Sequence, residues 1–249
     1  MGRSASGQIA EWGDVPESEP RSSGVSIESA QAALKHAVER ALSVQQPVVV
    51  RHVQRTTRTR PDAEPRRIVR ALERQYLAAV STSGAAVGGA AAAPGVGTGA
   101  AAAISVGEIG FFLEASALLS LAVAEVHGLQ IDDLERRRTL LLAVLLGDSG
   151  VKVVEKAAAR TGAHWGRKIT NQVSMETILR INSVLGRHFV TKYGTKQGII
   201  VIGRLAPFGI GVAIGGGGNA LLGRGVVTGT RRAFGPVPAG LPGHLQPEM

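Results

Sequence analysis

The feature that most constrains this chain is a run of 32 residues, 76 to 107, that contains no charged side chain and consists mainly of Ala, Gly, Ser and Thr. About 20 apolar residues are enough to span a bilayer, but Gly and Ala are poor residues for facing lipid. Small residues four apart, such as Gly84 and Gly88, let helix backbones approach closely. Because Pro94 divides the run, we expect two close-packed helical segments that form a hairpin, lying in the core or inserting shallowly into lipid.

Helical periodicity in the rest of the chain predicts an all-α protein, a compact multi-helix bundle with Ala/Gly-rich helical hairpins. A second uncharged run, 205 to 223, is rich in Gly and precedes a Gly-rich stretch that continues to Phe234. The three consecutive valines at 48 to 50 predict a short extended stretch, followed by a basic linker up to residue 65. The predicted helices cover residues 26–43, 66–80, 105–127, 133–146, 151–160 and 174–190.

Composition divides the chain into four parts. Residues 1–25 are rich in Ser, Gly, Glu and Pro and predict a disordered arm, and residues 26–65 hold the first helix and the basic linker. Residues 66–234 form the main helical domain. Residues 235–249 contain four prolines and predict a disordered tail.

Charge is distributed unevenly along the chain. The net charge is +9, and residues 150 to 249 alone hold 13 Lys and Arg against 3 Asp and Glu. This excess favours an anionic membrane surface or a membrane protein as partner. We expect no nucleic-acid partner, because the few aromatic residues do not interleave with basic ones. The candidate residues for binding anionic lipid or a partner are Lys192, Lys196, Arg204, Arg224, Arg231 and Arg232.

A second basic surface is predicted on the helix that begins at residue 66. Its apolar residues fall within one arc, and Arg66, Arg67, Arg70 and Arg74 fall on the opposite side. An amphipathic helix with a basic face is typical of a solvated surface and, in some proteins, of a membrane-surface element.

Polar residues in apolar surroundings are candidates for lining a cavity. They are Glu108, Glu114, Glu125 and Asn219. Glu114 and Glu125 lie eleven residues apart and therefore share one face of a helix. A buried carboxylate would mark a catalytic site if the protein were an enzyme.

Catalytic motifs in the sequence are incomplete. Gly147-Asp148-Ser149-Gly150 resembles a protease nucleophile segment, but its helical flanks favour the end of one helix and the start of the next. Ser105, with Asp132 or Asp133 and His164 or His188, follows the chain order of α/β hydrolases, but an Ala-rich run precedes it in place of a strand. Neither a thiolate site nor a disulfide is possible without Cys. We expect no metal and no cofactor, since the histidines never form a His-x-x-x-His pair and the glycine clusters lack a nucleotide-binding signature.

Several short motifs, taken in order, resemble the EcsC protein family over residues 66 to 234. They are Pro94-Gly95-Val96-Gly97-Thr98, the segment 121–128 with Glu125 and His127, Asp132-Asp133 with Glu135-Arg136, Leu145-Leu146-Gly147, Ile181-Asn182, Thr191-Lys192-Tyr193-Gly194, Gly203-Arg204 with Pro207, and Ile214-Gly215-Gly216 with Asn219 and Arg224. The resemblance implies a mostly helical protein of unsettled activity, associated with a bacterial operon that encodes an ABC transporter.

These observations together predict a bacterial membrane-associated accessory protein. We place it in the cytoplasm, peripheral to the inner membrane, because the first eleven residues contain no apolar signal-peptide segment. Whether it is an enzyme is left open. The alternative is a soluble helical hydrolase that acts on lipid or peptide, and the small-residue repeats also suit a homo-oligomer.

Overall fold

The computed structural model describes residues 27–91, 98–157, 164–204 and 210–246, and describes side chains within 32–90, 107–157, 164–192 and 216–246. All regular elements in these ranges are helical, which confirms the predicted all-α bundle. They are α1 (Ile27–Leu42), α2 (Gln46–Arg58), α3 (Pro65–Ala91), α4 (Thr98–Val126), α5 (Leu134–Leu146), α6 (Asp148–Ala157), α7 (Trp165–Asn171), α8 (Met175–Arg204), α9 (Ile210–Phe234) and the short 3₁₀ helix η1 (Gly243–Leu245).

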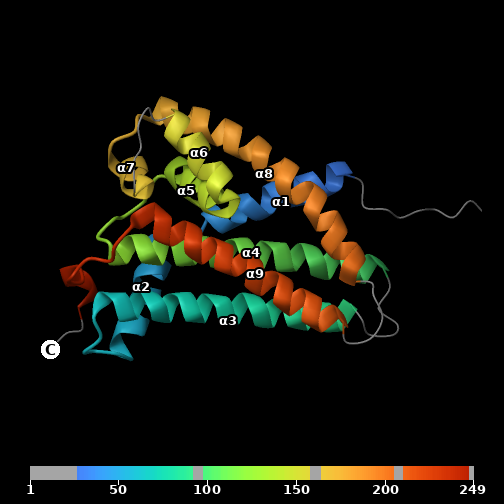
Figure 1. Ribbon diagram of the computed structural model, residues 1–249, viewed down its shortest axis with the longest axis horizontal. Helices are drawn as coiled ribbons and strands as arrows, with labels where there is room; N and C mark the ends of the chain where they lie inside the picture. The colour runs from blue at the N-terminus through green and yellow to red at the C-terminus, as the bar shows by residue number, and fades with distance from the viewer. Residues whose placement is uncertain (1–26, 92–97, 158–163, 205–209, 247–249) are drawn as a thin grey trace, which may run out of the picture.

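Helices α3, α4 and α9, three of the four longest in the described residues, pack against one another, and α9 crosses in front of α3 and α4 in Figure 1. Helix α5 packs against α8 and α6 and also contacts α9, so it connects the group of α3, α4 and α9 to α6 and α8. Helices α1 and α2 pack against α4.

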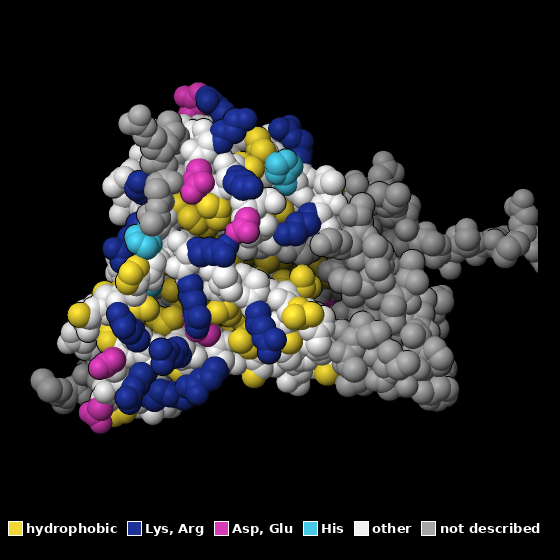
Figure 2. Space-filling model, in the orientation of Figure 1, with side chains coloured by type: hydrophobic (Ala, Val, Ile, Leu, Met, Phe, Trp, Pro, Cys, Tyr) yellow, Lys and Arg dark blue, Asp and Glu magenta, His cyan; other side chains and the backbone are white. Residues whose placement is uncertain are grey.

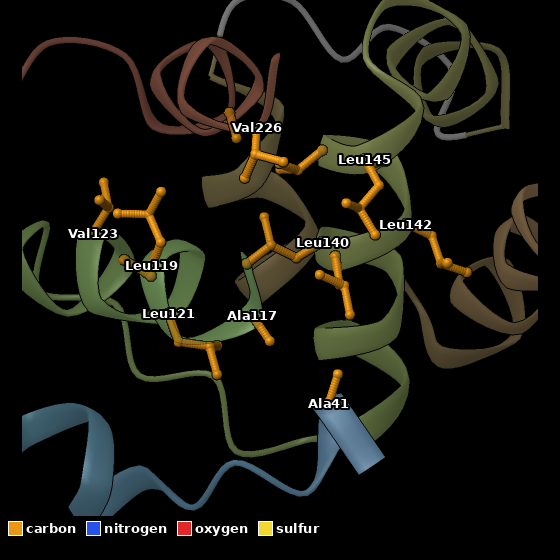
Figure 3. Close-up of a cluster of buried hydrophobic side chains, with 14 of the residues drawn as sticks. Ala41, Ala117, Leu119, Leu121, Val123, Leu140, Leu142, Leu145 and Val226 are labelled. Carbon is orange, nitrogen blue, oxygen red and sulfur yellow. The ribbon is translucent and has the colours of Figure 1, made fainter. Parts of the chain in front are cut away.

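The core is centred where α1, α4, α5 and α9 meet. Apolar side chains such as Ala41, Leu119, Leu140 and Val226 point toward one another there (Figure 3). Every residue from 139 to 146 of α5 is buried, as expected for a helix that is apolar on all sides.

Small residues create the contact between α3 and α9. Gly84 and Gly88 are buried on α3. On α9, a Cβ added at Gly216 would lie 3.2 Å from the Ala85 Cβ, and one added at Gly223 would lie 3.0 Å from a methyl of Leu77. Gly216 and Gly223 therefore allow α9 to pack closely against α3. The predicted turn of the hairpin, which includes Pro94, lies outside the described residues.

Three segments are more helical than the sequence predicted. Residues 48 to 50, predicted to be extended, belong to α2, where a proline occupies the first turn and Val49 and Val53 are fully buried. Burial of these valines outweighs the weak β preference of the residue type. Helix α8 continues past Gly194 to residue 204, and the Gly-rich stretch from 210 to 234 is one helix.

The C-terminal segment also differs from its prediction. Residues 235 to 246 lie against the bundle, where the sequence predicted a disordered tail. Gly235 has a φ of +75°, which redirects the chain at the end of α9. Leu245 at the end of η1 is only 1% exposed. Residues 235 to 246 are held in place by the burial of Leu245 and by the hydrogen bonds described below. The proline content of this segment had suggested disorder. The predicted disordered arm, 1–25, lies outside the described residues.

Candidate functional site

A groove lined by arginines lies between the α2–α3 loop, α3 and α9. Its volume is about 710 Å³, and five of its lining residues are arginines, against two carboxylates. Lys and Arg side chains gather over this part of the molecule, at the lower left of Figure 2. The lining residues that carry charge are Arg60, Asp62, Arg67, Arg70, Glu73, Arg74 and Arg231. We refer to this feature as the arginine groove.

The sequence of α3 explains why three of these arginines share one wall. Arg67, Arg70 and Arg74 follow the i, i+3, i+7 spacing of a single helix face. The opposite face carries Ile68 and Leu72, which are almost fully buried. All three arginines are exposed, and none forms an ion pair with a residue in the described part of the chain. Three of the four arginines of the predicted basic face therefore form one wall of the groove, and Arg66 does not line it.

On the α9 side of the groove, a buried carboxylate holds Arg231 in place. Arg231 donates from Nε to Glu73 Oε1 over 2.6 Å and from Nη2 to Glu73 Oε2 over 2.5 Å. Glu73 is only 5% exposed, whereas the Arg231 side chain is 60% exposed. The hydrogen bonds that Arg231 donates to Glu73 raise the pKa of Arg231 above its usual value. The paired contact fixes the guanidinium plane and leaves Nη1 outside the pair.

The hydrogen bonds of two other arginines orient their side chains. Arg74 donates from Nε to the carbonyl of Arg70 over 3.3 Å, and Arg60 donates from Nη1 to the Thr59 hydroxyl over 2.8 Å. Glu73 is matched by Arg231, so Asp62 is the other carboxylate lining the groove, against four remaining arginines. The groove therefore carries a net positive charge suited to an anion.

The other predicted basic residues are dispersed. Lys192 is half-buried and donates to the carbonyl of Leu146 over 3.0 Å at the C-terminal end of α5, where a cation is favourable. Arg232 forms an ion pair with Asp148. Arg224 is exposed and lies seven residues before Arg231, on the same side of α9. The side chains of Lys196 and Arg204 lie outside the described residues.

Two of the polar residues predicted to line a cavity form a buried pair. The Asn219 amide nitrogen donates to Glu108 Oε1 over 2.8 Å and to the Val80 carbonyl over 3.0 Å. Both side chains are more than 90% buried where α3, α4 and α9 meet. Glu114 instead forms a surface ion pair with Arg40 of α1, over 2.6 Å. Neither contact is part of the arginine groove.

Glu125 has a separate environment and is fully buried. Its Oε1 lies 2.5 Å from His244 Nε2, and Gln46 donates its amide to Oε2. Gln54 of α2 donates to the His244 carbonyl over 3.0 Å, which ties the C-terminal segment to α2. Seventeen residues separate Glu108 from Glu125 on α4, about 25 Å along the helix axis, so the predicted glutamates do not converge on one cavity.

Sequence reasoning missed three of these contacts. The partners in Arg231–Glu73 and His244–Glu125 are more than 100 residues apart, so no local pattern predicts them. Arg137 is also buried, and its guanidinium donates to the carbonyls of Ile131 and Val44. Burial lowers the pKa of Arg137 below its usual value. The available signal for this contact was that Arg137 precedes Leu140 and Leu141 by three and four residues, and so shares their face of α5.

The segments that resemble catalytic motifs lie within helices or at the junction of two helices. Helix α5 ends at Leu146, Gly147 follows it with a φ of +62°, and α6 begins at Asp148. The protease-like segment is therefore a helix end followed by a helix start. A Cβ on Gly150 would lie 2.5 Å from the Ala143 carbonyl oxygen, so close packing against α5 explains why a glycine is needed at this position. The Ser105 side chain lies outside the described residues, and Asp133 caps α5 by accepting from the Arg136 backbone N–H over 2.9 Å. Within the described ranges, no three His, Asp or Glu side chains group as metal ligands.

Comparison with known proteins gives no relative. No family model matches the chain, and neither a curated protein nor a solved structure matches it.

Proposed function

We propose that this protein is a membrane-associated accessory protein that attaches peripherally to an anionic surface through the arginine groove. The observation that carries the proposal is the convergence of Arg60, Arg67, Arg70 and Arg74 with no ion pair to a described residue. The exposed Arg224, on the same side of α9 as Arg231, extends the same basic surface. The resemblance to the EcsC family supports the cytoplasmic face of a bacterial membrane as the location, and an ABC transporter as a candidate partner there.

The expected strength follows from the number of arginines. A basic residue near an anionic bilayer contributes about 1 kcal/mol. Four arginines then supply about 4 kcal/mol, or about a thousandfold in partitioning. Salt screens such contacts, so attachment of this kind is reversible.

The test is flotation with vesicles of phosphatidylcholine alone or mixed with phosphatidylglycerol, at low and high salt. We expect the protein to float only with the anionic vesicles at low salt and to leave them in high salt or carbonate. The variant Arg67→Gln/Arg70→Gln/Arg74→Gln should lose flotation.

A matched control removes the same number of charges elsewhere. Lys152, Lys156 and Arg187 are exposed on α6 and α8 and do not line the groove. Their triple replacement by Gln should leave flotation nearly unchanged. If the wild-type protein never floats, or if both triple variants lose flotation equally, the proposal is wrong.

A further inference from the structure

The arginine groove has properties that a generally basic surface does not need. It is an open groove with a volume of about 710 Å³, which leaves room for one charged group of a ligand. A flat anionic surface would contact the exposed tips of arginines, whereas a groove admits a single protruding group. The shape therefore suggests a discrete ligand in addition to surface attachment.

All five basic residues that line the groove are arginines, although the chain also uses lysine elsewhere. The guanidinium fork binds two oxygens of one phosphate, which the point charge of lysine cannot do. Arg231 is held in a fixed plane by the buried Glu73, and Arg74 is tethered to the α3 backbone. Such orientation before binding lowers the entropy lost when a ligand arrives.

The charge of the groove indicates which phosphate it suits. Arg231 is partly satisfied by Glu73, and the four other arginines face one further carboxylate, Asp62. A phosphomonoester carries a charge of about −1.5 to −2 and three terminal oxygens. A phosphodiester, as in phosphatidylglycerol, carries a single charge and two free oxygens, so it fills fewer of these forks.

We infer that the arginine groove is a specific binding site for a phosphomonoester group, such as the headgroup of a phosphatidic-acid-type lipid. This inference rests on the proposed function for its lipid source, but the same chemistry is offered by a soluble phosphomonoester. The phosphate would bind between the two helices that line the groove. It would contact Arg67, Arg70 and Arg74 of α3 and Arg231 of α9.

The test separates guanidinium recognition from net charge. Vesicles of phosphatidic acid and of phosphatidylglycerol, matched in surface charge, are compared by flotation. The wild type should prefer phosphatidic acid by about tenfold, because one or two more charge-assisted hydrogen bonds form. The variant Arg67→Lys/Arg74→Lys keeps every charge, so it should bind phosphatidylglycerol vesicles within about twofold of wild type while losing the preference.

The control is Arg180→Lys/Arg187→Lys on α8, which replaces two exposed arginines at the same seven-residue spacing and should keep the preference. Glycerol 3-phosphate provides the soluble arm, read as a rise in melting temperature. If it raises the melting temperature of wild type but not of Arg67→Lys/Arg74→Lys, the phosphomonoester site is supported even when no vesicle binds, and the source is soluble. If the wild type binds charge-matched vesicles equally and glycerol 3-phosphate has no effect, the phosphomonoester site is refuted while peripheral attachment stands.

Discussion

Two glycines of α9, one helical turn apart, test how closely this bundle is packed. Gly229 is buried, and a Cβ added there would lie 2.9 Å from the carbonyl oxygen and 3.2 Å from a methyl of Val144 on α5. Gly225 is exposed, and a Cβ added there would meet no atom within 4 Å. Replacement by Ala should therefore stabilise the protein at Gly225 but not at Gly229.

The magnitudes follow from two terms. Ala is favoured over Gly inside a helix by about 1 kcal/mol, so Gly225→Ala should raise the free energy of unfolding by about that amount. Gly229→Ala gains the same term but forces a methyl onto a backbone oxygen that no side-chain rotation can move. Overpacking of this kind costs about 1–3 kcal/mol, so Gly229→Ala should be neutral to destabilising, by up to about 2 kcal/mol.

The assay is urea unfolding followed by circular dichroism at 222 nm, with melting temperatures alongside. A difference of 1 kcal/mol corresponds to about 2–4 °C in a chain of this size. Gly225→Ala is the control for helix propensity, since it changes the same residue type in the same helix. Equal stabilisation by both variants would show that α9 and α5 are not in backbone contact at Gly229.

Two further perturbations address buried polar groups. His244→Ala removes one partner of the fully buried Glu125 carboxylate, so it should lower the free energy of unfolding by about 1–3 kcal/mol. It should also speed amide exchange in residues 235 to 246, and unchanged exchange there would contradict the contact. Burial lowers the pKa of His127 below 6.5, so the unfolded chain takes up the proton first and the free energy of unfolding should fall as the pH drops below about 6.5. His127→Gln should flatten that fall in urea titrations at pH 5 to 8, and an identical slope in the variant would place the titrating group elsewhere.

Local patterns were enough for much of the fold. The apolar run from Leu140 to Leu146 and the preceding acidic residues predicted α5 and its cap, and the structure selects Asp133 as the capping residue. Helix α9 could not be predicted, because its glycines are poor helix formers by themselves. Its helical form is accounted for by close packing at Gly216 and Gly223 against α3, which is a tertiary effect.

The candidate site could also be predicted only in part from the sequence. The arginine face of α3 follows from the spacing of Arg67, Arg70 and Arg74, and Arg231 was expected to bind anions. That these residues share one groove depends on α3 and α9 lying side by side, which no local pattern contains. The glutamates proposed to line a cavity have separate partners, Asn219, Arg40 and His244, because periodicity gives a shared helix face but not the partners that each residue meets there.

The same partners bear on whether the apolar helix α4 could enter a membrane. Its segment Gly107–Val126 has a mean hydropathy of 1.8, enough to span a bilayer by length and composition, yet 67% of it is buried inside the bundle. Near the two ends of the segment, insertion would separate Glu108 from Asn219 and Glu125 from His244 and Gln46. It would also place Glu114 near the middle of the segment, where a charged side chain costs about 3 kcal/mol even on insertion scales. Attachment through the arginine groove breaks none of these contacts. Release by salt is therefore the expected behaviour, and a carbonate-resistant fraction would require the bundle itself to open.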